Sequence, residues 1–252
     1  MPALHFIEKG RGPFTLVFLH FFGGSANTWS AAMVMLSPRY RCIALDLRGF
    51  GASSAPNKPS TVRDHTNDVL ELLDAFHLEQ FVVIGHSMGG KIAVSLAARR
   101  PKGLCALVLL APSPPSPEPR SEQDQKDLLA AVGHRPALEK LVQKITVQSL
   151  SPVIFDQVVA DHLRTAPLAW QSWIEVGSQE DISVEAALVQ VPVRIISGAQ
   201  DPVFSTAFLQ EELGKYFPAA VFEEIPGSGH LLPLEAPDCL MLDYFQKFVV
   251  SA

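Results

Sequence analysis

Residues 81–98 read FVVIGHSMGGKIAVSLAA, and this stretch decides the fold. The apolar run Phe81–Ile84 predicts a buried strand, and the residues after Gly89 have the composition of a helix. Between them lies a Gly-x-Ser-x-Gly pattern, so Ser87 occupies a tight turn from strand to helix. Such a turn holds the serine in a strained backbone conformation, and the backbone N–H of Met88 points at any oxyanion formed beside it. The stretch therefore predicts a serine nucleophile at one edge of a sheet.

A serine needs a base to take its proton near neutral pH, and His230 is the best placed of the eight histidines. It lies on a Gly-rich loop shortly after the strand-like run Ala219–Phe222. The third member should be an acid that orients the imidazole, and Asp201 follows the strand-like run Val193–Ile196. We therefore predict that Ser87, Asp201 and His230 are catalytic, in that order along the chain.

Strand-like and helix-like segments alternate along much of the chain, which is typical of a parallel sheet covered by helices on both faces. The segments are 15–19, 31–36, 41–45, 62–76, 81–84, 90–100 and 106–110. After Leu110 the alternation stops at a proline-rich stretch, 111–119, which we expect to be an extended hinge. Residues 121–179 then read as helical without intervening strands, and strands return at Val193. The fold class is therefore α/β, with a mostly parallel central sheet and an inserted helical segment.

The chain resembles the α/β-hydrolase fold family, and within it the compact serine hydrolases with a small helical lid. Beside the turn at Ser87, the resemblance rests on Leu19–Gly24 (LHFFGG) and Asp46–Ser53 (DLRGFGAS). The loops that carry Asp201 and His230 complete it, and in this family the nucleophile, acid and base follow one another in that order.

The resemblance covers the chain from about Phe14 to the C-terminus. It implies that residues 1–111 and 180–252 form the hydrolase core. It also implies that residues 112–179 form a lid, or cap, over the active site.

In the family, the loop after an early strand supplies a second oxyanion N–H, and the match places that donor at Phe22. One residue departs from the pattern, because Phe21 stands where the family usually has glycine. Glycine there allows a positive φ that phenylalanine resists. We therefore expect either a different path for this loop or a phenylalanine ring packed over the pocket.

The substrate pocket is predicted to be apolar at its mouth, which favours an uncharged acyl or aryl group. Residues that adjoin the predicted catalytic loops or lie on the lid should line it. They are Phe21, Trp170, Trp173, Phe204 and Leu231. The two tryptophans are three residues apart on an expected helix, a spacing that is more often packing between lid and core than a binding surface.

Composition excludes several other classes of function. The net charge is −6 and no basic cluster occurs, which argues against a nucleic-acid partner. No apolar run approaches the roughly 18 residues that span a bilayer. The N-terminus lacks the pattern of a secretory signal, and the odd count of 3 cysteines suggests buried free thiols. We expect a cytoplasmic monomer or homodimer that acts on a small molecule.

No cofactor or metal is expected. His134 and His162 lack metal-ligand spacing, so we interpret them as surface residues. Lys91 follows Gly90 as in a phosphate-binding loop, but Ile92 stands where such a loop needs a hydroxyl.

Two hypotheses of function remain open. The first is a serine hydrolase that cleaves carboxylic esters or related acyl compounds through an acyl-enzyme on Ser87. The second uses the same fold and catalytic residues for carbon–carbon bond hydrolysis, lyase or perhydrolase chemistry, or as a slow-turnover ligand receptor. An aspartate in place of Ser87 would have indicated dehalogenation or epoxide opening. Glu180 and Asp181 are alternative acids, but they precede the expected strand at Val193 instead of following it.

Overall fold

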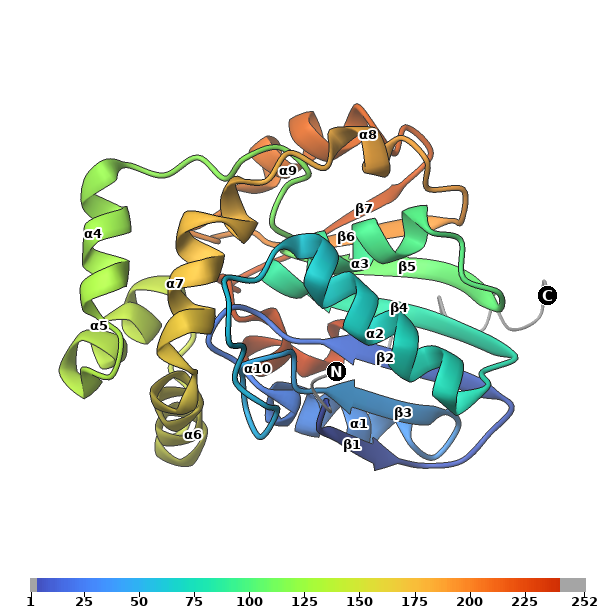
Figure 1. Ribbon diagram of the computed structural model, residues 1–252, viewed down its shortest axis with the longest axis horizontal. Coiled ribbons are helices and arrows are strands. Elements are labelled where there is room, and N and C mark those ends of the chain that lie inside the picture. Colours follow the sequence, from blue (N-terminus) through green and yellow to red (C-terminus); the bar gives the residue numbers. More distant parts are fainter. Residues whose placement is uncertain (1–3, 241–252) are drawn as a thin grey trace.

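The computed structural model describes residues 4–240, and within them seven strands form one sheet in the order β1-β3-β2-β4-β5-β6-β7 (Figure 1). The strands are β1 Phe6–Lys9, β2 Phe14–Leu19, β3 Arg41–Leu45, β4 Gln80–His86, β5 Leu104–Leu110, β6 Val193–Gly198 and β7 Val221–Ile225. β1 runs antiparallel to β3, and all other neighbouring strands pair in parallel.

The helices of the described residues connect these strands. The longer ones are α1 Ser30–Leu36, α2 Val62–Phe76, α3 Met88–Ala98, α4 Glu122–Ala130, α5 Arg135–Ile145, α6 Pro152–Arg164, α7 Pro167–Glu175 and α9 Thr206–Gly214. The shorter ones are α8 Ser183–Ala186, α10 Leu232–Glu235 and the 3₁₀ turns η1 Ala26–Trp29, η2 Gly177–Gln179 and η3 Pro237–Leu240.

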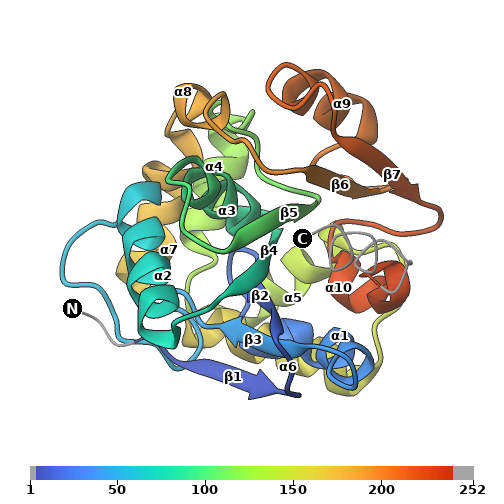
Figure 2. The ribbon, with the colours of Figure 1, turned by 90° about the vertical axis from the view of Figure 1, so that its right-hand side faces the viewer.

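Different helices cover the two faces of the sheet (Figure 2). Side chains alternate between the faces of a strand, so the neighbours Val17 and Phe18 belong to different apolar clusters. The cluster of Val17 includes residues of α2, α3 and α9, whereas that of Phe18 includes residues of α1 and α10. The predicted fold class, a mostly parallel sheet with helices on both faces, is therefore confirmed.

Local signals set the bounds of the elements where they are strong. The predicted helix 62–76 has those bounds as α2. The Thr61 hydroxyl accepts a hydrogen bond from the Asp64 N–H, and the Asp64 carboxylate accepts one from the Thr61 N–H, which satisfies two donors at the helix start. The helix ends at Phe76, and the next residue, His77, has a left-handed backbone with a φ of 48° that turns the chain away.

The segment between β5 and β6, residues 111–192, carries helices α4 to α8, and we call it the helical insertion. Helices α4 to α7 lie beyond the carboxyl ends of the parallel strands (Figure 1). The proline-rich stretch 111–119 forms neither helix nor strand, but most of it is buried instead of acting as a free hinge. It is tied to the end of the insertion, because the Glu118 N–H donates to the Ser178 carbonyl and the Ile182 N–H to the Pro115 carbonyl.

The structure also bears on the length of the apolar helices and on the burial of the three cysteines. Among residues 4–240, no helix is long and apolar enough to cross a membrane. Cys42 and Cys239 are buried free thiols, but Cys105 is only half-buried. It stands near the start of β5, where the strand is less covered than its buried later half.

Candidate active site

The turn after β4 presents Ser87 in a strained conformation. Its φ of 51° and ψ of −116° lie in a region that L-residues rarely adopt. A side chain at Gly85 would overlap the Gly89 carbonyl, and one at Gly89 would overlap the Leu19 carbonyl. Both glycines are therefore needed for the close packing of strand and helix. The Ser87 N–H donates to the Leu110 carbonyl at 3.0 Å, which ties the turn to the end of β5.

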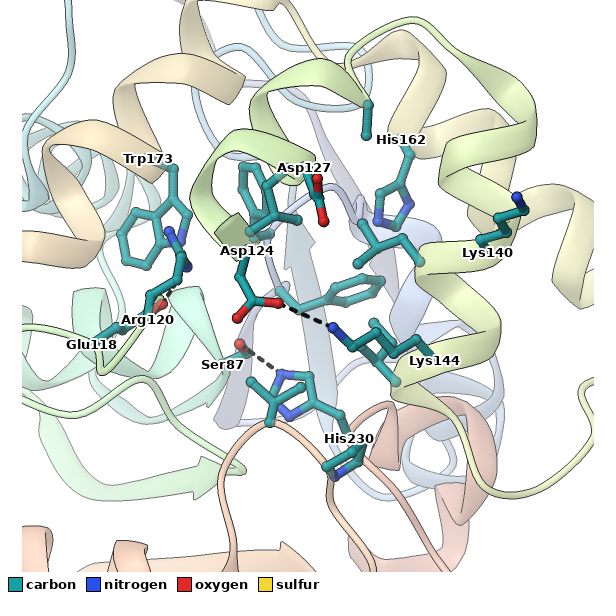
Figure 3. Close-up of a pocket in the computed structure, with 18 of the residues that line it drawn as sticks. Ser87, Glu118, Arg120, Asp124, Asp127, Lys140, Lys144, His162, Trp173 and His230 are labelled. Carbon is teal, nitrogen blue, oxygen red and sulfur yellow. Dashed lines mark hydrogen bonds and ion pairs between the residues drawn. The ribbon is translucent and has the colours of Figure 1, made fainter. Parts of the chain in front are cut away.

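The structure brings Ser87, Asp201 and His230 together from three loops at one edge of the sheet. The Ser87 hydroxyl donates to His230 Nε2 at 2.9 Å (Figure 3). On the other side of the ring, His230 Nδ1–H donates to Asp201 Oδ2 at 2.8 Å. An ionised Asp201 can only accept, so it selects the imidazole tautomer whose Nε2 is free to take a proton. All three side chains are buried.

Backbone donors hold the Asp201 carboxylate in place. Its Oδ1 accepts the N–H groups of Val203 at 2.7 Å and Phe204 at 3.1 Å. The two other acids considered from the sequence are occupied elsewhere: Glu180 accepts the Val62 N–H, and Asp181 is exposed and accepts the Ser183 N–H. The geometry therefore favours Asp201 as the acid beside His230.

Glu235 supports the loop of His230, and sequence reasoning missed it. Its carboxylate accepts the N–H groups on either side of His230, those of Gly229 and Leu231, each at 3.0 Å. It also accepts two N–H groups of the helical insertion, at residues 147 and 148, each at 2.9 Å. The signal was available, because Glu235 is the only charged residue of the apolar run 231–236.

The loop after β2 carries the second predicted oxyanion donor. The Phe21 carbonyl accepts hydrogen bonds from His20 Nδ1–H at 2.7 Å and from the Gly24 N–H at 3.0 Å. The Gly89 N–H donates to the His20 carbonyl, which joins this loop to the start of α3. Within residues 4–240, the N–H groups of Phe22 and Met88 donate to no other group. Both therefore lack an acceptor within the described part of the chain.

Phe21 is accommodated without strain, because the positive φ of this loop falls at Gly23, where it is 82°. The Phe21 ring is buried and packs between two imidazoles. Its ring centroid lies 5.2 Å from that of His86 and 5.7 Å from that of His162. The Phe21 ring is therefore packed in the wall of a cavity, which was one of the two outcomes expected for this departure from the family pattern.

The prediction that His162 lies on the surface is wrong, whereas His134 is exposed as expected. His162 is buried because it continues the inward-facing stripe of Val158 and Val159 on α6. Its Nδ1–H donates to the Val158 carbonyl at 2.8 Å, and burial lowers the pKa of the imidazole. The helical spacing of that stripe was the missed signal.

A cavity of about 1020 Å³ opens in front of Ser87 and His230. Of the predicted pocket residues, Phe21, Trp173 and Phe204 line it, and so does Phe22. Trp170 and Leu231 are instead buried in the cluster behind it. The ring centroids of Trp170 and Phe22 lie 4.4 Å apart. The Trp170 indole N–H donates to the Leu128 carbonyl, because α7 packs against α4.

The cavity is not apolar throughout, contrary to the expectation for its mouth. Charged side chains of α4 and α5 face each other across it, and Lys144 pairs with Asp124 at 3.2 Å (Figure 3). On the wall beside Trp173, Arg120 pairs with the largely buried Glu118 at 2.7 Å. The lining therefore combines aromatic side chains with charged side chains, and the helices of the insertion supply most of the charged ones.

Lys91 takes no part in a phosphate site. Its side chain is fully buried, and Nζ donates to the Ser116 and Ser178 carbonyls, each at 3.2 Å. Burial lowers the pKa of this amine to about 8. Among residues 4–240, no cluster of three or more histidine, cysteine or acidic side chains could hold a metal ion.

A family profile described as "alpha/beta hydrolase fold" matches residues 15–142, about half of the sequence. The chain belongs to this family. It is 31% identical over 238 residues to a putative 2-succinyl-6-hydroxy-2,4-cyclohexadiene-1-carboxylate synthase of Bacillus subtilis (strain 168), covering 88% of this chain and 85% of the relative.

Solved structures of the same fold are also similar to this α/β-hydrolase. An enol-lactonase from Burkholderia xenovorans LB400 has a TM-score of 0.84 at 24% identity, covering 99% of this chain and 97% of the other. An esterase from Exiguobacterium antarcticum has a TM-score of 0.89 at 18% identity, covering 98% and 96%. Since these identities are low, the likeness concerns the fold, and the substrate must be argued from the site.

Proposed function

We propose that this α/β-hydrolase is a serine hydrolase that cleaves carboxylic esters or related acyl compounds through an acyl-enzyme on Ser87. The observation that carries the proposal is the chain of hydrogen bonds from Asp201 through His230 to Ser87 at the wall of a cavity. The two free N–H groups of Phe22 and Met88 support it, because acyl transfer develops negative charge on the carbonyl oxygen.

The proposed reaction has two steps. In the first, Ser87 Oγ attacks the acyl carbonyl while His230 Nε2 takes its proton, and the oxyanion accepts hydrogen bonds from the N–H groups of Phe22 and Met88. Collapse breaks the ester bond, and His230 returns the proton to the leaving alcohol. In the second step, water attacks the acyl-enzyme with His230 again as base, which releases the acid and restores Ser87.

The aromatic side chains of the lining suit an apolar acyl or aryl group, and the charged side chains of α4 and α5 suit a polar remainder of the substrate. An internal ester, as in a lactone, satisfies the same mechanism. The enol-lactonase among the structural relatives and the esterase both carry names consistent with this chemistry.

A second candidate is lyase chemistry at the same site, with no acyl-enzyme. The Bacillus subtilis relative favours it, because that protein is named as a synthase. In this case His230 would act on a proton of the substrate, with Ser87 as part of a relay. The two candidates differ in whether Ser87 becomes acylated.

Hydrolysis of p-nitrophenyl esters of graded chain length tests the proposal. We expect turnover with a burst of one nitrophenol per active site, and covalent labelling of the wild type by a fluorophosphonate. Ser87→Ala should abolish labelling and lower turnover by several orders of magnitude while the protein stays folded. Labelling that persists in Ser87→Ala would place the nucleophile elsewhere, and binding of esters without turnover would favour the receptor hypothesis.

A further inference from the structure

Helix α6 of the insertion contacts the loop that carries Phe22, through the consecutive residues Asp161 and His162. The Ser25 hydroxyl donates to Asp161 Oδ2 at 2.8 Å, and both side chains are buried. Ser25 lies three residues after Phe22 and caps η1, since its Oγ also accepts the Asn27 N–H. The hydrogen bond therefore joins the insertion to the predicted oxyanion loop.

The Asp161 carboxylate is oriented by donors of its own helix. Its Oδ1 accepts Arg164 Nη2 at 2.6 Å and Gln157 Nε2 at 2.9 Å. A buried carboxylate is costly unless such partners satisfy it, and with Oδ1 occupied, Oδ2 is directed at Ser25. Asp161 is thus a buried carboxylate with hydrogen-bond partners on both oxygens, and one of these partners, Ser25, belongs to the loop.

His162 contacts the same loop at its turn. A Cβ at Gly23 would overlap the His162 imidazole, so glycine is needed there both for its φ of 82° and for the ring. The His162 ring also packs on Phe21, the residue that replaces the glycine usual in the family. The side chain that departs from the family pattern is therefore held by the insertion.

The sheet holds the loop from the other side. Asp46, directly after β3, accepts the Ala26 N–H, and His20 Nδ1–H donates to the Phe21 carbonyl. Along the chain, Phe22 directly follows the anchored Phe21 carbonyl and precedes Gly23 and Ser25, the two positions that contact α6. Loss of either set would leave the donor free to move, and a donor displaced by about 1 Å contributes little to catalysis.

We propose that Asp161 is a positioning residue of the reaction, which acts through Ser25 to hold the Phe22 N–H where the oxyanion forms. The helical insertion is then part of the catalytic centre and more than a cover over it. The inference rests on the proposed function, because it assumes that an oxyanion forms beside Ser87.

The test compares Asp161→Ala and Ser25→Ala with wild type in ester hydrolysis. One oxyanion donor is worth roughly 10²–10³ in rate, so its partial misplacement should lower kcat by about 10- to 100-fold. KM should change by less than about threefold, because the donor acts on the transition state. Affinity for a trifluoromethyl ketone, which forms a tetrahedral adduct with serine, should fall in parallel with kcat/KM.

A matched control lies on the same helix. Asp156 is exposed and pairs with Arg135 at 3.3 Å, away from the oxyanion loop, so Asp156→Ala should keep the wild-type kcat. Ser25→Ala keeps the test valid if Asp161→Ala fails to fold. It removes the hydrogen bond between the two residues from the other side, with little change in side-chain volume. In kcat, the double variant should lose little more than the worse single variant, since the hydrogen bond between Ser25 and Asp161 is the contact that both variants remove.

The inference is overturned if folded Ser25→Ala keeps the wild-type kcat, if its loss falls on KM alone, or if Asp156→Ala loses as much. These outcomes differ from failure of the proposed function. That failure would appear as absence of ester turnover and of Ser87 acylation in the wild type itself.

Discussion

At the scale of single residues, the chemistry depends on which acid orients His230. Asp201 is placed by two backbone N–H groups at its own loop and meets His230 Nδ1 at 2.8 Å. Asp181 is an exposed residue of similar chemistry that accepts the Ser183 N–H and has no contact with the imidazole. The two therefore form a matched pair for a test.

Asp201→Asn should lower kcat by about 10⁴, because an amide cannot impose the tautomer that leaves Nε2 as the base. Asp181→Asn should keep the wild-type rate. Steady-state hydrolysis of a p-nitrophenyl ester measures both. Near-full activity in Asp201→Asn together with loss in Asp181→Asn would reassign the acid.

At the scale of elements, Glu235 at the end of α10 joins the loop of His230 to the segment after α5. The Glu235 carboxylate accepts N–H groups from both segments, at Gly229 and at Val147. The His230 N–H also donates to the Ile145 carbonyl at 2.9 Å. Helix α6 makes the corresponding link to the loop of Phe22. The insertion thus contacts two of the loops that converge on Ser87.

Glu235→Gln should destabilise the protein by at least about 2 kcal/mol and lower kcat. Its amide nitrogen would face N–H donors that the wild-type carboxylate satisfies, and hydrogen bonds to a charged group are each worth about 1.5–3 kcal/mol. Urea unfolding and ester hydrolysis provide the measurements. Glu211→Gln, an exposed change on α9, is the control. Equal stability of the two variants would show that the Glu235 contacts contribute little.

At the scale of the whole molecule, burial favours the neutral form of four histidines. They are His20, His65, His86 and His162, and burial is the largest cause that lowers the pKa of each. For His65 the pKa falls to about 3. In the unfolded chain these groups titrate near their ordinary pKa of about 6.5. Below pH 6.5, the unfolded chain therefore binds more protons at these histidines than the folded chain does.

The free energy of unfolding should consequently fall as the pH drops below about 6.5, since stability decreases where the unfolded state binds more protons. Each such histidine contributes at most about 1.4 kcal/mol per pH unit between 6.5 and its folded pKa. Urea unfolding at pH 7, 6 and 5 measures the slope. His65→Gln should reduce the slope of the unfolding free energy against pH by up to about 1.4 kcal/mol per pH unit, which corresponds to one proton. Replacement of the exposed His134 by Gln should leave the slope unchanged. An unchanged slope in His65→Gln would contradict this account.

The sequence by itself determined the parallel sheet and the turn at Ser87, and it predicted Asp201 and His230 as partners. These features depend on patterns within a few residues, such as an apolar run followed by Gly-x-Ser-x-Gly, or on loops that follow strand-like runs. Helix α2 kept its predicted bounds because its capping residues are adjacent in sequence.

Only the tertiary structure decided what surrounds those residues. Asp161 and Ser25 are separated by 136 positions, and Glu235 and Val147 by 88, so no local pattern links them. Trp170 and Leu231, expected to line the pocket, lie in the core instead. His162, expected on the surface, lies in the cavity wall. In each case the packing of the insertion against the loops determines which side chains are covered. Burial and hydrogen bonding between distant segments belong to the folded chain, and the periodicity of one segment does not specify its partner.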